Sequence, residues 1–417
     1  MNKTGRASKG FDITIEKLVH EGMGLARHEG KVVFVPFSVP GDHLSVRAVE
    51  EKKTFTRANI VQILKPGNGR VKPVCPYFER CGGCQLQQLE YPRQVEGKRQ
   101  ILEEIMHHRF PEARNLAVTM SACAQPYAYR SRARMQIRGF GTKSVVGFFR
   151  YRSHTVEDIE RCPLFRESLN EALSSLRQFK VKVDTDASPQ EMDIACSEEE
   201  DTWASARVGA AADEGITTLL GTRRREEVIL RRKVLDSSYS VTASVFFQAN
   251  DFMVPELASL VLELAKNRGC NSAIDLFAGV GLFSLPLTGF FEKVIAVESS
   301  ATAGRLCAAN ASAAGLSNIQ TVCADASSWM KSAGTSGLPG FDLIVLDPPR
   351  TGAGAEAMEQ ISELAPETVI YVSCDPQTLV RDIAIISPQH YRIDFIQGLD
   401  MFPQTYHFET VVRLVRN

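Results

Sequence analysis

The sequence predicts a protein of the α/β class, in which a small β-barrel and a cysteine-bearing central region precede a parallel sheet flanked by helices. Three observations lead to this expectation. Short alternating strand patterns fill residues 11–65, cysteines cluster after them, and strand patterns alternate with helix patterns after about residue 246. Because the 417 residues exceed what one hydrophobic core usually serves, we expect domains at 1–68, 69–243 and 244–417.

Composition and charge narrow the classes of function. Hydrophobic residues at 44% and charged residues at 23% are typical of folded proteins and exclude a largely disordered or fibrous chain. No uncharged stretch is long enough to span a membrane and no apolar signal core follows the N-terminus, so we expect a cytoplasmic protein. We also expect a monomer. Residues 1–166 hold 28 Lys and Arg against 16 Asp and Glu, whereas residues 167–417 hold 20 against 33. The basic first part suggests a polyanionic partner, with chance segregation of charge as the alternative.

The first strand patterns are short runs such as Lys31–Pro36 and His43–Val49, separated by turn signals such as Pro40-Gly41-Asp42. Their size and spacing predict an oligonucleotide-binding β-barrel, and another small β-domain is the alternative. A barrel of this type agrees with the basic charge of this part. A helical pattern follows at Arg93–Arg109.

Ten cysteines occur in a chain without a secretion signal, so most of them should be reduced and available as metal ligands or for catalysis. Cys75, Cys81 and Cys84 stand close together, and Gly82-Gly83 allows the backbone to fold tightly between them. Cys162 is the best-placed fourth ligand in the same basic part. Four thiolates at this spacing can hold an iron-sulfur cluster or a structural zinc ion, and the spacing does not decide between them.

A strand pattern at Tyr129–Ile137 carries arginine at every second position. The three residues are Arg130, Arg132 and Arg134. Because three guanidinium groups on one face of a strand would repel each other, we expect a phosphate backbone over them, and an edge strand splayed into solvent is the alternative. Residues 187–215 are polar and acidic and carry no motif, so we expect loops or a hairpin there.

After about residue 246 the alternation of strand and helix patterns predicts a parallel sheet. The six predicted strands are Ser272–Phe277, Lys293–Glu298, Ile319–Asp325, Phe341–Asp347, Thr368–Cys374 and His407–Val415. In such a sheet, ligands bind beyond the carboxyl ends of the strands. The residues at those ends are therefore the candidates for a binding site.

The first four of these strands each end in a residue suited to a ligand. Phe277 leads into a loop where Gly279 allows close approach, and Glu298 can bind both hydroxyl groups of a ribose. Asp325 can accept a hydrogen bond from an adenine amino group. Asp347 begins an Asp-Pro-Pro-Arg loop, which is typical of S-adenosylmethionine-dependent methyltransferases and favours a Rossmann-like domain of that type over a dinucleotide site. The alternative is that these carboxylates only cap the helices that follow the strands. Capping could explain any one of them, but it explains the whole set poorly.

Cys374 follows the fifth strand and precedes Asp375-Pro376, a pair that predicts the start of a helix. A thiol beside a helix N-terminus should ionise more readily, so we expect Cys374 to be a nucleophile. Glu409 lies at the start of the last strand and is a candidate general base. Considered alone, Cys374 could instead be a buried structural cysteine, and Glu409 could be a glutamate in a salt bridge.

Together these two residues suit methylation at carbon 5 of uracil, which is too weak a nucleophile to react unaided. A thiolate that adds to carbon 6 makes carbon 5 reactive toward the methyl group of S-adenosylmethionine, and a base then removes the carbon 5 proton so that the thiol can leave. The target base must leave its stack, which agrees with an RNA-binding first part.

These motifs resemble the RNA uracil-5-methyltransferases over essentially the whole chain. The resemblance rests on Phe246-Phe-Gln248-Ala-Asn, Asp347-Pro-Pro-Arg, Ser-Cys374-Asp-Pro and Phe-Pro-x-Thr-x-His-x-Glu409. It implies an N-terminal TRAM-like barrel, Cys374 as the nucleophile, Glu409 as the base and an RNA-facing Phe246. The S-adenosylmethionine site would be lined by Gln248, Phe277, Glu298 and Asp347. A [4Fe-4S] cluster would be held by Cys75, Cys81, Cys84 and Cys162.

The cluster and the barrel together most resemble the branch that methylates 23S ribosomal RNA, and the thymine-loop uridine of transfer RNA is the alternative substrate. A non-catalytic iron-sulfur protein that binds RNA is an alternative from a different class. A DNA cytosine-5-methyltransferase is disfavoured because its Pro-Cys and Glu-Asn-Val motifs are missing. A radical S-adenosylmethionine enzyme is disfavoured because five residues, rather than three, separate Cys75 from Cys81.

Overall fold

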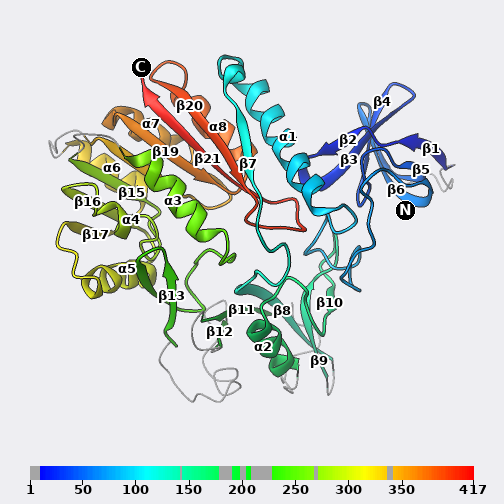
Figure 1. The fold of residues 1–417 in the computed structure, drawn as a ribbon, viewed down its shortest axis with the longest axis horizontal. Helices are drawn as coiled ribbons and strands as arrows, with labels where there is room; N and C mark the ends of the chain where they lie inside the picture. Colours follow the sequence, from blue (N-terminus) through cyan, green and yellow to red (C-terminus); the bar gives the residue numbers. More distant parts are fainter. Residues whose placement is uncertain are drawn as a thin grey trace.

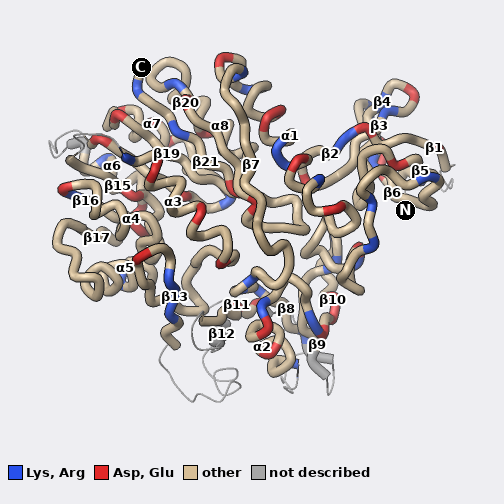
Figure 2. Tube along the Cα trace, in the orientation of Figure 1, with Lys and Arg blue, Asp and Glu red and all other residues tan. Residues whose placement is uncertain are grey.

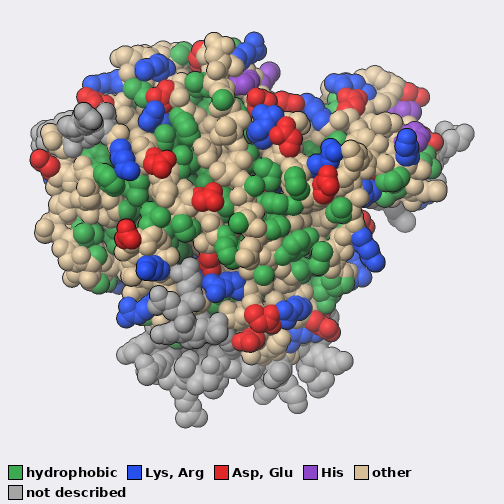
Figure 3. Space-filling model, in the orientation of Figure 1, with side chains coloured by type: hydrophobic (Ala, Val, Ile, Leu, Met, Phe, Trp, Pro, Cys, Tyr) green, Lys and Arg blue, Asp and Glu red, His purple; other side chains and the backbone are tan. Residues whose placement is uncertain are grey.

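The computed structural model describes residues 10–140, 143–177, 190–197, 203–207, 228–266, 271–335 and 341–417. Within these residues the strands form sheets of six, five, two and eight strands. In Figure 1 the six-stranded sheet (blue) stands apart from the eight-stranded sheet, whose strands are green to red except for the cyan β7, and the five-stranded sheet lies below and between them. In the space-filling view of the same face, the N-terminal part projects as a separate lobe (Figure 3).

The six-stranded sheet is the predicted N-terminal β-domain. Its strands are β1 (Phe11–Thr14), β2 (Lys17–Val19), β3 (Met23–His28), β4 (Lys31–Val35), β5 (His43–Glu51) and β6 (Phe55–Lys65). The order is β1-β5-β6-β4-β3-β2, with a short 3-10 turn, η1 (His20–Gly22), between β2 and β3. Alternating residues such as Val33 and Val35, or Leu44 and Val46, point inward and form its core.

A long helix leads from the N-terminal lobe to the C-terminal sheet. Helix α1 (Tyr91–Arg109) covers the helical pattern predicted at 93–109, has a proline in its first turn and three basic residues in its last turn. A 3-10 turn, η2 (Pro111–Asn115), then connects α1 to β7 (Val118–Ser121).

The central part is a five-stranded sheet with one covering helix, α2 (Glu167–Arg177). Its strands are β8 (Arg132–Phe140), β9 (Lys143–Phe149), β10 (Val156–Asp158), β11 (Gln190–Cys196) and β12 (Trp203–Arg207), in the order β10-β9-β8-β11-β12. Strands β11 and β12 form the hairpin expected within 187–215, and the rest of that segment lies outside the described residues. A separate hairpin, β13 (Leu230–Val234) and β14 (Ser237–Val241), packs against α5.

The eight-stranded sheet forms the C-terminal part. Its strands are β15 (Ser272–Leu276), β16 (Lys293–Glu298), β17 (Ile319–Cys323), β18 (Leu343–Leu346), β19 (Thr368–Ser373), β20 (Tyr391–Leu399), β21 (Glu409–Arg416) and β7. The order is β17-β16-β15-β18-β19-β21-β20-β7. All six predicted strands are present, and the first five run parallel as expected.

Three features of this sheet differ from the prediction. Strand β21 runs antiparallel to both neighbours, and β20 and β7 extend the sheet beyond it. Strand β20 includes polar residues such as Asp394 and Gln397, which obscure its apolar pattern. Strand β7 has only four residues and lies far from the others in the sequence. These two strands are therefore identified by pairing rather than by composition.

Helices cover both faces of this sheet and explain why the strand sequences are apolar in continuous runs. One face packs against α3 (Val254–Ala265), α4 (Ser284–Leu287) and α5 (Ala301–Ala313). The other packs against α1, α6 (Ala326–Thr335), α7 (Ala355–Leu364) and α8 (Pro376–Ile386). Within β15, for example, Ala273 faces the first set of helices and Ile274 faces the second. None of the described helices combines the length and apolar character that crossing a membrane requires.

Candidate active site and cysteine pocket

The carboxyl edge of the parallel strands brings together the acidic residues that the sequence placed there. Glu298 ends β16 and accepts hydrogen bonds from the backbone N–H groups of Gly279 at 2.9 Å and Ser300 at 2.6 Å. Asp325 lies just before α6 and accepts one from the N–H of Ser328 at 3.0 Å. Glu298 therefore joins the loop after β15 to the start of α5.

The loop after β15 has the backbone conformation that the glycines suggested. Phe277, Gly279 and Gly281 all have positive φ angles, of 61°, 57° and 96°. A Cβ atom built on Gly279 meets no atom within 4 Å, so its glycine is required by the backbone angle and not by crowding. A cleft of about 350 Å³ lies next to Glu298, between β16, β17 and α5. The cleft includes Glu298 but not Gln248, Asp325 or Asp347, so it offers room for part of a ligand beside the end of β16.

Asp347 and Gln248 meet at the centre of the edge. The side-chain amide of Gln248 donates to a carboxylate oxygen of Asp347 at 3.3 Å. Burial raises the pKa of Asp347 to about 7, and the hydrogen bond from Gln248 only partly offsets this. The amide oxygen of Gln248 is buried and has no hydrogen-bond partner. An unsatisfied acceptor beside a carboxyl group fits a ligand with hydrogen-bond donors, such as the hydroxyl and ammonium groups of S-adenosylmethionine.

Asp275 is a further buried carboxyl that the sequence reasoning treated only as part of a strand. It is fully buried within β15 and accepts a hydrogen bond from the hydroxyl of Ser284, while its second oxygen is unpaired. Burial raises its pKa to about 7, and the negative charges of Asp347 and Glu298 act in the same direction. An aspartate within an otherwise apolar strand was the signal that could have identified it.

Cys374 and Glu409 lie across from each other at the ends of two adjacent strands. Strands β19 and β21 are antiparallel neighbours in which Ser373 pairs with Thr410. Continuing the same register by one residue places Cys374 opposite Glu409. The structure thus brings together the two residues proposed for catalysis, although 35 positions separate them in the sequence.

The expectation that Cys374 ionises readily is wrong for the free protein. Burial raises the pKa of its thiol to about 12, and the carboxylates of Glu409, Asp347 and Asp375 add to this effect. Asp375 caps the helix that follows Cys374 by accepting from the N–H groups of Gln377 and Thr378. The guanidinium of Arg350 is the nearby group that lowers the pKa of Cys374.

Glu409 is equally shielded from water. Its side chain is 3% exposed, and one carboxylate oxygen has no hydrogen-bond partner. Burial and the charge of Asp347 raise its pKa well above the usual range, whereas Arg350 lowers it. His407 stays neutral because burial and Arg350 lower its pKa to about 3. Its ring nitrogen Nε2 lies 3.3 Å from a nitrogen of the Arg350 guanidinium.

Residues 400–408, called the catalytic loop below, connect β20 to Glu409 and are held by buried contacts. Asp400 pairs with the ammonium group of Lys98 on α1 at 2.6 Å, with exposed side-chain fractions of 0% and 1%. Lys98 also donates to the backbone oxygens of Phe402 at 3.2 Å and His407 at 2.9 Å. The hydroxyl of Tyr129 donates to the oxygen of Pro403 at 3.0 Å. Two separate segments of the central part, helix α1 and the chain at Tyr129, therefore help to position Glu409.

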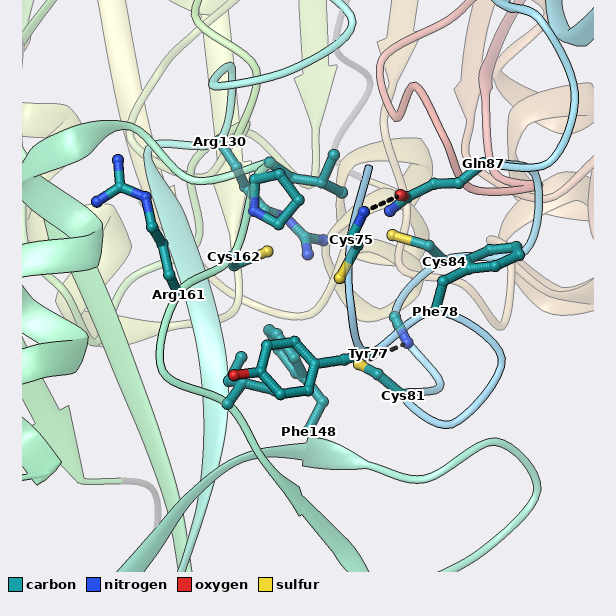
Figure 4. Close-up of a pocket in the computed structure, with 14 residues that line it drawn as sticks. Cys75, Tyr77, Phe78, Cys81, Cys84, Gln87, Arg130, Phe148, Arg161 and Cys162 are labelled. Atoms are coloured by element: carbon teal, nitrogen blue, oxygen red, sulfur yellow. Dashed lines mark hydrogen bonds between the residues drawn. The ribbon is translucent and has the colours of Figure 1, made fainter. Parts of the chain in front are cut away.

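The four cysteines chosen as metal ligands line one cavity together with Arg130. Figure 4 shows the sulfur atoms of Cys75, Cys84 and Cys162 directed into the space between these side chains. Burial raises the pKa of all four thiols, that of Cys81 to about 11 and that of Cys162 to about 12. Among the described residues, no group of three or more His, Cys, Asp or Glu side chains is arranged to hold a metal ion.

Two of the three arginines of the strand near residue 130 bind protein oxygen atoms, so their mutual repulsion does not require a phosphate backbone over them. Arg132 donates to the backbone oxygens of Val245, Phe247 and Ala243 at distances of 2.6, 3.3 and 3.2 Å. Arg134 forms two hydrogen bonds with Asp193 on the neighbouring β11, at 2.9 and 3.0 Å. Arg130 points into the cysteine cavity instead. Carbonyl and carboxylate oxygens from distant segments thus replace the expected phosphate.

Phe246, the other residue expected to face RNA, is 68% exposed. The Arg132 guanidinium lies over its ring, 5.6 Å from the centroid. Two residues further along the chain, Gln248 contacts Asp347. An exposed aromatic ring at this position is available to a base that enters the site.

Fold and site define a methyltransferase of the S-adenosylmethionine-dependent type, and the comparisons with known proteins agree. Residues 225–417 match the tRNA (uracil-5-)-methyltransferase family, and residues 11–68 match the TRAM domain of tRNA (uracil(54)-C(5))-methyltransferase. The 23S rRNA (uracil(1939)-C(5))-methyltransferase RlmD of Pectobacterium atrosepticum is 32% identical over 97% of this chain and 93% of its own length. An uncharacterized RNA methyltransferase of Thermotoga maritima is 31% identical over 97% and 98%.

Solved structures give the same result. The tRNA (uracil-54, C5)-methyltransferase of Pyrococcus abyssi, crystallised with S-adenosyl-L-homocysteine, superposes with a TM-score of 0.73 at 27% identity, covering 97% of this chain and 99% of that one. The chain therefore belongs to the RNA uracil-5-methyltransferase family. Its N-terminal six-stranded sheet is a TRAM domain, and its C-terminal sheet is the S-adenosylmethionine-dependent methyltransferase fold.

Proposed function

We propose that this RNA uracil-5-methyltransferase modifies carbon 5 of a uridine in 23S ribosomal RNA. The observation that carries this choice is the similarity to RlmD proteins, which reaches 30–32% identity over 97–98% of the chain. Transfer RNA is the second candidate, because the Pyrococcus abyssi tRNA enzyme superposes over 97% of the chain. Both substrates present a uracil base, so the same catalytic pair serves either.

Cys374 is the proposed nucleophile and Glu409 the proposed base. The Cys374 sulfur forms a bond to carbon 6 of the uracil, which moves electrons to carbon 5. Carbon 5 then accepts the methyl group that S-adenosylmethionine supplies. Glu409 removes the proton from carbon 5, the double bond re-forms, and the carbon-sulfur bond to Cys374 breaks. The adjacency of the two residues across β19 and β21 supports this division of roles.

The raised pKa values of this site fit a mechanism that is switched on by ligands. In the free protein, burial raises the pKa values of both Cys374 and Glu409, which disfavours their ionised forms. Arg350 opposes this effect at both residues. A cationic methyl donor bound near Asp347 would add a second positive charge and favour the ionised forms that the reaction uses.

The proposed S-adenosylmethionine site consists of the strand-end residues of the C-terminal sheet. Glu298 would bind the ribose hydroxyl groups and Asp325 the adenine amino group, because each carboxylate lies beside the loop at its own strand end. Gln248 and Asp347 would bind the polar end of the ligand through the unpaired amide oxygen and the carboxyl group. Phe277 and Gly279 form the loop that approaches it.

We propose that Cys75, Cys81, Cys84 and Cys162 hold a [4Fe-4S] cluster. Four thiols around one cavity are the ligand set of such a cluster, in which each iron takes one thiolate. Arg130 lines the same cavity, and its buried Nε atom has no hydrogen-bond partner, as expected for a cation beside an anionic cluster.

We propose that the protein acts in the cytoplasm, because reduced cysteines and an RNA substrate favour that compartment. We also propose that it is a monomer with three domains, at residues 1–68, 69–243 and 244–417. Phe246 is proposed to contact the RNA through its exposed ring.

The test of the proposed function is methyl transfer from labelled S-adenosylmethionine to unmodified ribosomal and transfer RNA in parallel, with mass spectrometry of the nucleosides. We expect 5-methyluridine in 23S ribosomal RNA alone. Label in transfer RNA alone would replace the substrate assignment, and no label in either pool with anaerobically prepared, cofactor-binding protein would overturn it.

A further inference from the structure

A groove of about 580 Å³ lies beside the catalytic loop and is formed by segments that are far apart in the sequence. One wall comes from the turn η1 of the TRAM domain and another from the segment that carries the cysteines. The connection between β9 and β10 and the catalytic loop complete it. The lining residues that matter here are Glu21, Phe149, Arg150, Tyr151, Arg152 and Tyr406. The groove exists only because all three parts of the chain meet at this point.

Aromatic rings fix the walls of this groove. Tyr406 packs against His407 with ring centroids 3.9 Å apart. Tyr151 contacts Phe37 of the TRAM domain edge-on at 4.9 Å. Phe149 contacts the ring of His154 in the same way at 5.7 Å. Rings held rigidly in this manner are platforms on which unpaired bases stack, regardless of base identity.

Positive charge is in excess along the same groove. Arg150 and Arg80 share the single carboxylate of Glu157, at 2.7 and 2.9 Å. Arg152 lies 3.6 Å from Glu21 and over the ring of Tyr151. Figure 2 marks Lys and Arg segments around β9 and β10. The Arg150 and Arg152 side chains are 52% and 43% exposed, so both guanidinium groups are accessible to a phosphate group.

The position of the groove relative to the catalytic pair identifies its ligand. Tyr406 lies three residues before Glu409, a separation that the backbone spans in at most about 11 Å. This separation is short enough for a nucleotide adjoining the target uridine to occupy the groove while the target is at Glu409. A base and a phosphate together match the aromatic and cationic walls.

We propose that this groove binds an unpaired nucleotide that flanks the target uridine, with its base stacked on Tyr406 and its phosphate held by Arg150 and Arg152. The inference rests on the proposed function, since it requires an RNA substrate that carries a target uridine at Cys374. It adds a second point at which the RNA is read, outside the pocket of the methylated base. The target must be single-stranded or opened around this position for both sites to be filled.

A double-mutant cycle that combines a change in the protein with a change in the RNA tests the proposal. The substrate is a short RNA hairpin that contains the uridine methylated by the wild-type protein, and each flanking nucleotide in turn is made abasic. For one flanking position we expect the abasic change to raise KM by roughly 5- to 150-fold in the wild type. With Tyr406→Leu, the same abasic change should have no further effect, because the stacking partner is already gone.

Matched controls separate this effect from a general loss of structure. Phe290→Leu removes an aromatic ring that is 45% exposed on the methyltransferase domain, and Arg392→Gln removes an exposed charge on β20. Neither change should alter the effect of the abasic position, whereas Arg152→Gln should raise KM. Affinity for S-adenosylmethionine, measured by calorimetry, should be unchanged in Tyr406→Leu.

A second measurement uses the wild-type protein alone and covers the case in which Tyr406→Leu does not fold. The same hairpin carries 5-iodouridine at the identified flanking position, and the photocrosslinked peptide is identified by mass spectrometry. We expect crosslinks within residues 148–154 or at Tyr406. Crosslinks elsewhere, or abasic effects that multiply with Tyr406→Leu at every position, would overturn the groove assignment while leaving the methyltransferase activity intact. A wild-type protein that methylates no RNA would instead overturn the proposed function and this inference with it.

Discussion

Gln94 on α1 and Gln404 in the catalytic loop exchange two hydrogen bonds across 310 residues of sequence. The Gln94 amide nitrogen donates to the Gln404 side-chain oxygen at 2.9 Å, and the Gln404 backbone N–H donates to the Gln94 oxygen at 3.0 Å. The backbone N–H groups of Gln85 and Leu86, which directly follow the cysteines, donate to the Gln404 carbonyl at 3.1 and 3.0 Å. The cysteine segment and the loop that leads to Glu409 are therefore one connected unit.

Gln94→Met should slow the reaction without weakening cofactor binding. The variant keeps the volume of the side chain but leaves buried groups of Gln404 unpaired, which costs about 1–3 kcal/mol and loosens the loop that holds Glu409. We expect kcat to fall roughly 10- to 100-fold, as for a small displacement of a catalytic group. Single-turnover methylation and calorimetry of S-adenosylmethionine binding measure the two effects. Gln100→Met on the exposed side of α1 is the control, and an equal loss of kcat in both variants would contradict the positioning role.

Cys374→Ala should abolish methyl transfer while the cofactor still binds. Removing the nucleophile prevents activation of carbon 5, so the rate should fall by at least about 10⁴-fold. Cys196→Ala removes a buried thiol of the central sheet and should retain activity. The measurement is incorporation of labelled methyl groups into RNA. Substantial turnover by Cys374→Ala would rule out the covalent mechanism.

Glu409→Gln should permit methylation but block release of the RNA. The amide cannot accept the carbon 5 proton, so the bond between Cys374 and carbon 6 persists. A protein-RNA adduct should therefore accumulate and migrate as a slower band on a denaturing gel. Glu356→Gln, an exposed residue in the first turn of α7, should form no such band. Free methylated RNA at the wild-type rate from Glu409→Gln would assign the base elsewhere.

Asp275 should make the free protein less stable as the pH rises. Its pKa is raised from 3.8 to about 7 in the folded state, so the folded protein binds this proton more tightly than the unfolded chain does. The contribution of Asp275 to the free energy of unfolding is fully present below pH 3.8 and is lost as the pH rises through about 7. The maximal loss from this group is about 4 kcal/mol.

Asp275→Asn should remove this pH dependence, because an amide does not titrate. Urea unfolding at several pH values, followed by the fluorescence of Trp329 in a Trp203→Phe background, measures the free energy of unfolding. Asp12→Asn, at an exposed position of β1, should keep the wild-type pH profile. An unchanged profile in Asp275→Asn would show that Asp275 does not carry the effect.

The protein purified without oxygen should be brown and contain about four iron atoms per chain. Cys84→Ser should lower the iron content and the visible absorbance, because one iron loses its thiolate. Cys323→Ser, which changes an exposed cysteine, should leave both unchanged. Iron analysis and absorption spectra give the answer, and one zinc ion per chain without iron would overturn the cluster assignment.

The sequence by itself determined the strands of the methyltransferase sheet and the residues at their ends. Apolar runs bounded by glycine, aspartate or proline locate β15 to β19 because these signals are local. The same locality made the four cysteines and the residues Cys374 and Glu409 visible as candidates. The charge difference between the two parts of the chain likewise followed from composition alone.

Only the tertiary structure decided how these residues meet. The antiparallel insertion of β21 between β19 and β20 places Glu409 opposite Cys374, and pairing of β7 extends the sheet. The pKa of Cys374 rises where the local helix signal predicted a fall, because burial and the charges of Glu409, Asp347 and Asp375 raise it. Arg132 is satisfied by carbonyl groups more than 100 residues away. Strand register, burial and charge pairing depend on contacts between distant segments, and a local pattern does not contain them.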